Sequence, residues 1–146
     1  MFDMAKRAWQ GIAGFMAGAA SAFVLVILVE MYSDKVHPMP PESAHSMEAV
    51  CAHVADYPAW VLATVVPMWA TTAFVAAWVA GALGGRIPAA MVSLLVMVAL
   101  AFNLAMLPYA SWFKALMPLA ALAGLALGDR AARQIPAGPH HPEPGA

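Results

Sequence analysis

Three polar or charged residues interrupt otherwise apolar runs: Glu30, Asn103 and Lys114. Such residues are rare within apolar segments of this length. Glu30 could face the interior of a helix bundle, where it would pair with Lys114 and accept a hydrogen bond from Asn103. Alternatively, its carboxylate could bind a proton or a cation there. Two simpler interpretations remain open. Glu30 and Lys114 could extend to the headgroups of a membrane, and Asn103 could serve only to join helices by hydrogen bonds.

Two aromatic side chains of interfacial type lie at the same level as these three residues, near the ends of their runs. The candidate polar binding cluster is therefore Glu30, Asn103, Lys114, Tyr109 and Trp60. Because all five lie toward one end of their segments, the sequence places this chemistry on one side of the protein rather than along a path through it.

A second group of chemically capable residues lies between 33 and 58: His37, His45, Glu48, Cys51, His53 and Asp56. His45 and Glu48 are three residues apart and would share a helix face, but His45 and His53 are too far apart along a helix to hold one ion. We therefore interpret this segment as a solvated, mildly acidic surface, and we expect no metal site.

Enzymatic signatures are missing from the sequence. It contains no Gly-x-Ser-x-Gly nucleophile elbow, no phosphate-binding loop and no His-Glu-x-x-His. Cys51 is the single cysteine and has no Cys-x-x-Cys partner for redox chemistry. The sequence thus assigns no catalytic residue and no cofactor, and it favours a protein that is not an enzyme without deciding the question.

Four apolar runs must position these residues, at about 9–31, 59–83, 88–107 and 112–128. Each is close to the roughly 20 residues that a helix needs to cross a bilayer. Of the 146 residues, 63% are hydrophobic and only 10% are charged, too few charges to cover a water-soluble domain. We expect an all-α, four-helix transmembrane bundle forming a single membrane domain over 1–134, with a short helix in the first external loop from about Pro41 to Asp56. The Pro- and Gly-rich tail 135–146 is expected to be disordered.

Five of the seven basic residues flank the same ends of these runs: Lys6, Arg7, Arg86, Arg130 and Arg133. Cytoplasmic segments carry an excess of Lys and Arg, so both termini are expected in the cytoplasm. The expected location is the bacterial cytoplasmic (inner) membrane, crossed several times. The formal net charge of −1 gives no basic field for nucleic acid, so the lipid bilayer is the expected partner.

Small residues recur at spacings of four on the first and last runs, at Gly14 and Gly18 and at Gly124 and Gly128. Such strips allow helix backbones to approach closely. The leading hypothesis is a protein that acts through helix association, as an accessory subunit of a larger membrane complex or as a homo-oligomer. The alternatives are a small transporter or channel subunit using Glu30 in an outer-side polar site, and a membrane enzyme acting at the outer leaflet.

A set of short motifs resembles small four-span bacterial membrane proteins of unassigned function. The motifs are Val29-Glu30-Met31-Tyr32, Pro38-Met39-Pro40, Gly84-Gly85-Arg86, and Asn103 followed by Pro108. In those proteins the tyrosine and the proline pair tend to be adjacent, whereas residues 33–37 separate them here. The resemblance implies the four-span plan and singles out Glu30 and Asn103, but it implies no mechanism.

Overall fold

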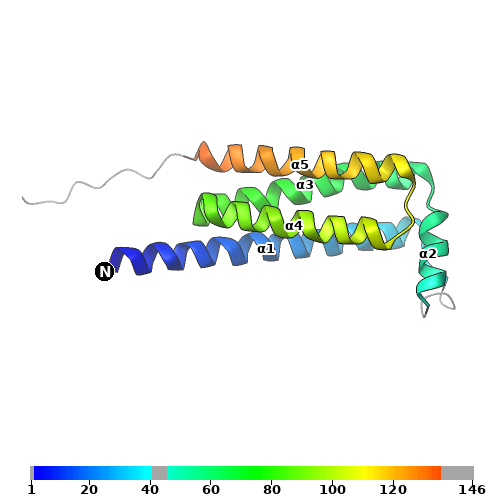
Figure 1. The fold of residues 1–146 in the computed structure, drawn as a ribbon, viewed down its shortest axis with the longest axis horizontal. Coiled ribbons are helices and arrows are strands. Elements are labelled where there is room, and N and C mark those ends of the chain that lie inside the picture. Colours follow the sequence, from blue (N-terminus) through cyan, green and yellow to red (C-terminus); the bar gives the residue numbers. More distant parts are fainter. Residues whose placement is uncertain (1, 41–45, 136–146) are drawn as a thin grey trace, which may run out of the picture.

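The computed structural model describes residues 2–40 and 46–135, and all its regular structure there is helical (Figure 1). The helices are α1 (Phe2–Val36), α2 (Met47–Ala55), α3 (Ala59–Gly84), α4 (Arg86–Met106) and α5 (Ser111–Arg133). All but α2 are long and apolar enough to cross a membrane. The predicted all-α four-helix bundle is confirmed, and the chain is a membrane protein.

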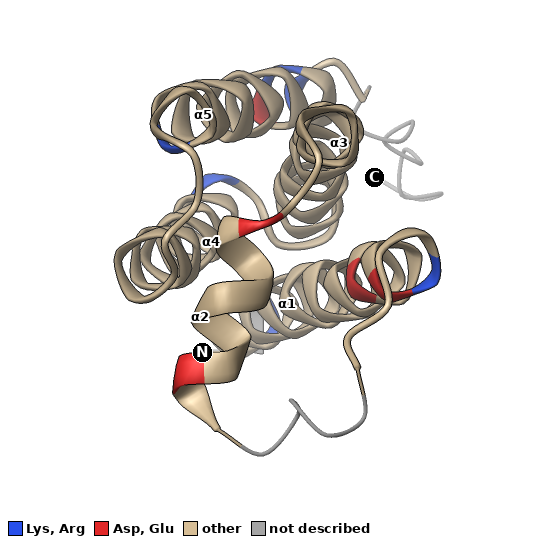
Figure 2. Ribbon diagram, turned by 90° about the vertical axis from the view of Figure 1, so that its right-hand side faces the viewer, with Lys and Arg blue, Asp and Glu red and all other residues tan. Residues whose placement is uncertain are grey.

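The four long helices run alternately up and down, and α2 lies across one end of them (Figures 1 and 2). We call this the loop end, because it also holds the α4–α5 turn. The opposite end carries the N-terminus, the α3–α4 turn and the end of α5, and we call it the basic end. Helix α3 packs against α1, α4 and α5, with its closest packing against α1 and α5.

Two helices extend well beyond the apolar runs from which they were predicted. Helix α1 continues from Phe2 to Val36 instead of 9–31, and α5 continues to Arg133 instead of 128. At 1.5 Å per residue, α1 is about 52 Å long, against a hydrocarbon core of about 30 Å. A helix need not end where its apolar residues end, and nothing in α1 interrupts it until the residues before Pro38.

The predicted short helix in this loop is present as α2, which begins at Met47. Its predicted start, near Pro41, lies outside the described residues. Ser46 has an extended backbone, and its hydroxyl accepts a hydrogen bond from the Ala49 N–H at 3.1 Å. This is the usual N-cap arrangement, in which a side-chain oxygen satisfies an amide of the first turn. Val54 is buried on this helix, which therefore contacts the rest of the loop end through its last turn.

The turn between α3 and α4 is a single residue, Gly85, with φ = +85°. A side chain is rarely tolerated at that angle, whereas glycine adopts it without strain. The Gly85 N–H donates to the Gly81 carbonyl and so closes the last turn of α3. The predicted tight turn at this point is present.

The centre of the bundle is made of small residues on α3, where Ala73, Ala76, Ala77 and Ala80 are fully buried. Their size allows neighbouring backbones to come very close. A Cβ on Gly14 would lie 2.5 Å from the Gly84 Cα, and one on Gly18 would lie 2.9 Å from the Ala76 carbonyl oxygen.

Helix α5 uses its glycines in the same way against the other side of α3. A Cβ on Gly124 would collide with the Ala70 carbonyl, and one on Gly128 with the Phe74 carbonyl. All four glycines of the two predicted strips thus lie in α1–α3 and α3–α5 contacts within one chain. The strips therefore supply no reason of their own for contact with a second molecule.

Candidate ligand-binding site

Two neighbouring cavities occupy the loop end of the bundle. The outer one, here called the vestibule, has a volume of about 200 Å³, and the inner chamber has about 30 Å³. Five residues line both, and all five are polar: Glu30, Ser33, Tyr57, Asn103 and Tyr109. We call these five residues the polar layer, because they separate the vestibule from the interior.

The polar layer is assembled from distant parts of the chain. Glu30 and Ser33 are three residues apart on α1 and so point to one side of it. Asn103 belongs to the last turn of α4. The two tyrosines come from irregular segments next to prolines, Tyr57 just before α3 and Tyr109 in the α4–α5 turn.

Below the polar layer the chamber is apolar. The rest of its lining is aliphatic, aromatic or thioether, with Leu62, Trp69, Leu100 and Met117 among the buried residues. A space of this size holds about one water molecule. In the described part of the chain only Ser33 and Thr72 are buried polar residues, and the Thr72 hydroxyl donates to the Met68 carbonyl of its own helix. Thr72 is thus the one fully buried polar side chain below the polar layer among the described residues.

The vestibule carries acidic but no permanently basic side chains. Asp34, His37 and His53 join Glu30 in its lining, and none of the described lining residues is Lys or Arg. Figure 2, which looks onto this end, shows acidic positions on α1 and α2 and basic positions on α1 and α5. Lys35, in the last turn of α1, and Lys114 do not line the vestibule. A small recess with two carboxylates and no opposing cation attracts positively charged ligands.

Two histidines and a tyrosine close one side of the vestibule. The rings of His37 and His53 stack with centroids 4.3 Å apart, and Tyr57 packs against both, at 4.7 Å and 5.4 Å. The His53 Nε2 lies 3.2 Å from the His37 carbonyl oxygen. The His37 Nε2 is buried and has no hydrogen-bond partner among the described residues. It is one polar atom in this region that a ligand or water could satisfy.

The electrostatics of the two loop tyrosines follow from this environment. Burial raises the pKa of Tyr109 to about 12, helped by the negative charge of Glu30 and by Tyr57, while a polar contact with Asn103 acts in the opposite direction. Burial, Glu30 and Asp34 likewise raise the pKa of Tyr57, against a polar contact with Ser33. Both phenols therefore stay protonated at neutral pH and can donate hydrogen bonds.

Three of the five residues in the predicted cluster come together here: Glu30, Asn103 and Tyr109. Lys114 and Trp60 line neither cavity, and Trp60 is 57% exposed. The ion pair considered between Glu30 and Lys114 is not formed. Among the side chains of residues 4–40 and 46–135 the one ion pair is Arg133–Asp129, at the basic end.

Ser33 and Tyr57 were not predicted as site residues, and neither was the stacking of His53 on His37. The predicted separation of His45 from His53 is not tested, because His45 lies outside the described residues. Ser33 gave a usable signal, because it follows Glu30 by three positions on an expected helix. The other contacts depend on how the loop folds back, which no spacing in the sequence reveals.

The donor set does not fit a directly coordinated metal ion. Among the described residues, no three His, Cys, Asp or Glu side chains are grouped closely enough to hold one. Cys51 is a free thiol that lines neither cavity. The chemistry available at the loop end is thus carboxylate charge, phenol and amide hydrogen bonding, and aromatic surface.

Comparison with models of known protein families, with curated proteins and with solved structures finds no match to this chain. The resemblance to small four-span bacterial proteins therefore stays a prediction.

Proposed function

We propose that this is a small multi-pass protein of the bacterial inner membrane that binds a small organic cation at its outer face. The observation that carries this proposal is the position of Glu30. It lines the vestibule together with Asn103 from a different helix, and the described lining holds a second carboxylate and no Lys or Arg. Glu30 lies in the apolar helix α1 near its loop end, where the side chain is exposed toward the cavity mouth or lipid. A carboxylate in a membrane-spanning helix is costly and is usually kept for binding.

The chemistry of the vestibule supports an organic cation rather than a metal ion. Metal ions need several converging ligands, which the described residues do not provide. An ammonium group, by contrast, can be held by one carboxylate and by aromatic faces within about 6 Å. Tyr57 and Tyr109 supply such faces beside Glu30, and a volume of about 200 Å³ suits a ligand of a few heavy atoms.

The orientation is part of the proposal. Lys6, Arg7, Arg86, Arg130 and Arg133 favour a cytoplasmic basic end, which makes the loop end the outer face. Ligand would then enter from outside. The apolar chamber beneath the polar layer supports a binding role rather than free passage, so transport by this chain would require another conformation or a partner.

The structure gives less support than the sequence did to the hypothesis that the protein acts through helix association. Its motive was the pair of glycine strips, and Gly14, Gly18, Gly124 and Gly128 all pack inside the chain. An enzyme at the outer leaflet also lacks support, because the vestibule offers no activated nucleophile. Oligomerisation stays a prediction, with no surface assigned to it.

Binding of tetramethylammonium to the purified full-length protein, measured by isothermal titration calorimetry, tests the proposal. Removing the charge with Glu30→Gln should weaken binding by about tenfold, or about 1.4 kcal/mol. Tetramethylammonium has no N–H to donate, so this loss measures charge attraction and not a hydrogen bond. Glu48→Gln is the matched control, because Glu48 is exposed on α2 and lines neither cavity. No binding by the native protein, or equal loss in both variants, would contradict the proposal.

A further inference from the structure

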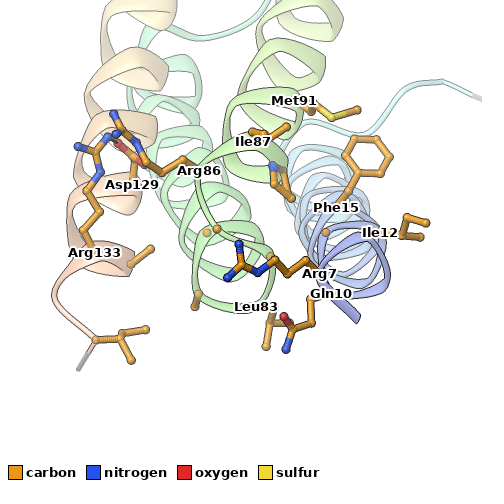
Figure 3. A pocket seen from close by; sticks show the side chains of 18 of the residues that line it. Arg7, Gln10, Ile12, Phe15, Leu83, Arg86, Ile87, Met91, Asp129 and Arg133 are labelled. Atoms are coloured by element: carbon orange, nitrogen blue, oxygen red, sulfur yellow. Dashed lines mark hydrogen bonds and ion pairs between the residues drawn. The ribbon is translucent and has the colours of Figure 1, made fainter. Parts of the chain in front are cut away.

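A large hollow lies at the basic end, remote from the vestibule. It has a volume of about 1190 Å³ and opens around the α3–α4 turn, between α1 on one side and α5 on the other (Figure 3). From the sequence, the basic residues at this end were used only to predict the orientation of the chain in the membrane. Three of them line one recess, and we call this recess the basic groove.

Each arginine of the basic groove comes from a different helix: Arg7 from α1, Arg86 from the start of α4, and Arg133 from the last turn of α5. Asp129 also lines it and pairs with Arg133. Among the side chains that the structure describes, those of residues 4–40 and 46–135, no carboxylate lies within ion-pair distance of Arg7 or Arg86. Three positive charges against one negative charge leave the groove positive.

The wall of the groove is apolar on the side of α1 and α4. Ile12, Ile87 and Met91 line it, and each has half or more of its surface exposed. Figure 3 shows these side chains beside the α1–α4 wall, with Arg86 and Arg133 on the α5 side. The groove therefore combines guanidinium groups with hydrocarbon surface that continues along the membrane-spanning helices.

We propose that the basic groove binds an anionic phospholipid, with its phosphate on Arg7, Arg86 and Arg133 and its acyl chains along the α1–α4 wall. Arginine forks match phosphate oxygens well, and basic recesses between membrane helices recognise acidic headgroups. The apolar wall distinguishes a lipid from a free phosphate ester, which would leave Ile12, Ile87 and Met91 without a role. This site does not depend on the function proposed for the vestibule.

Native mass spectrometry of the full-length protein tests the proposal, after incubation with equal amounts of phosphatidylglycerol and phosphatidylcholine of identical acyl chains. We expect preferential retention of phosphatidylglycerol. Arg86→Gln and Arg7→Gln should each reduce that retention by about fivefold, which corresponds to about 1 kcal/mol per basic residue. Arg130→Gln is the matched control, because Arg130 is exposed next to the site on α5 but does not line the groove. Using two separate variants covers the case in which one of them does not fold.

Four results would overturn the proposal. One is equal retention of both lipids, and another is equal loss with Arg130→Gln, which would indicate a general charge effect. A third is displacement of phosphatidylglycerol by glycerol 3-phosphate at comparable concentration, which would indicate a site for free phosphate esters. The last is retention of neither lipid, as expected if the chain's own residues 136–146, with Glu143, filled the groove.

Discussion

The imidazole ring of His53 on α2 stacks on that of His37, just beyond the end of α1, with the ring planes only 16° from parallel. The two residues are joined a second time by the approach of the His53 Nε2 to the His37 carbonyl oxygen. Together with the burial of Val54, this pair holds the last turn of α2 over the vestibule.

Replacing His53 by alanine is expected to loosen α2 without unfolding the bundle. A stacked aromatic pair contributes about 0.5–1.5 kcal/mol beyond the area it buries. His53→Ala should therefore raise amide hydrogen exchange over Met47–Ala55 by about two- to tenfold, while exchange in α3 stays unchanged. Met47→Ala, at an uncharged and exposed position of the same helix, is the control, and a similar rise in that variant would indicate that the stack does not anchor α2.

A methyl group added at Gly14 should destabilise the whole bundle. It would lie 2.5 Å from the Gly84 Cα, so α1 and α3 would have to separate. Overpacking of this kind costs about 1–3 kcal/mol, which thermal unfolding followed by circular dichroism in detergent would detect.

Gly11→Ala provides the matched comparison on the same helix. A Cβ at Gly11 would meet only the Pro88 Cγ, at 3.8 Å, an ordinary contact. Removing a glycine from a helix interior is favourable by about 0.5–1 kcal/mol, so this variant should be neutral or slightly more stable. If Gly14→Ala behaved like Gly11→Ala, the close α1–α3 contact would be wrong.

Alkaline titration should reveal a tyrosine that ionises unusually late. The pKa of Tyr109 is raised to about 12, chiefly by burial, so the folded protein holds this proton more tightly than the unfolded chain does. Stability from this group is therefore fully present below pH 10 and is lost as pH rises toward 12. Absorbance of phenolate near 295 nm should show a late component that Tyr109→Phe removes.

Glu30 contributes to that late ionisation through its negative charge. Glu30→Gln should therefore shift the late component to lower pH, whereas Glu48→Gln should leave it in place. An unchanged titration in Glu30→Gln would mean that Glu30 and Tyr109 do not share one cavity.

The architecture could be predicted because the apolar runs and the turn residues carry strong local signals. The short gap between the runs 59–83 and 88–107 marked the α3–α4 turn, and the start of the second run at 59 coincides with the start of α3. The ends of α1 and α5 could not be predicted in the same way, since hydrophobicity marks where a helix meets lipid and not where its hydrogen bonds stop.

The site was predicted in part. The sequence did not reveal which side of its helix each polar residue occupies. The position of a residue along its apolar run can be read from the sequence, and on that basis Glu30, Asn103 and Lys114 were predicted to lie at a similar level. Which way each faces depends on packing. In the first two turns of α5 the buried positions are Phe113 and Met117. Lys114 lies about 100° around the helix from Phe113 and lines neither cavity.

If the vestibule is hydrated and open to ligand, a cysteine in place of Asn103 should be accessible to a water-soluble reagent. In a Cys51→Ala background, Asn103→Cys should react with a charged, membrane-impermeant methanethiosulfonate added outside intact cells, and tetramethylammonium should slow that reaction. Phe102→Cys is the control, because Phe102 is 67% exposed on the outer face of α4 and would face lipid, where such reagents do not react. We expect fast modification of Asn103→Cys, and we expect tetramethylammonium to protect that cysteine. Equal inertness of both cysteines, or modification that tetramethylammonium does not slow, would contradict it.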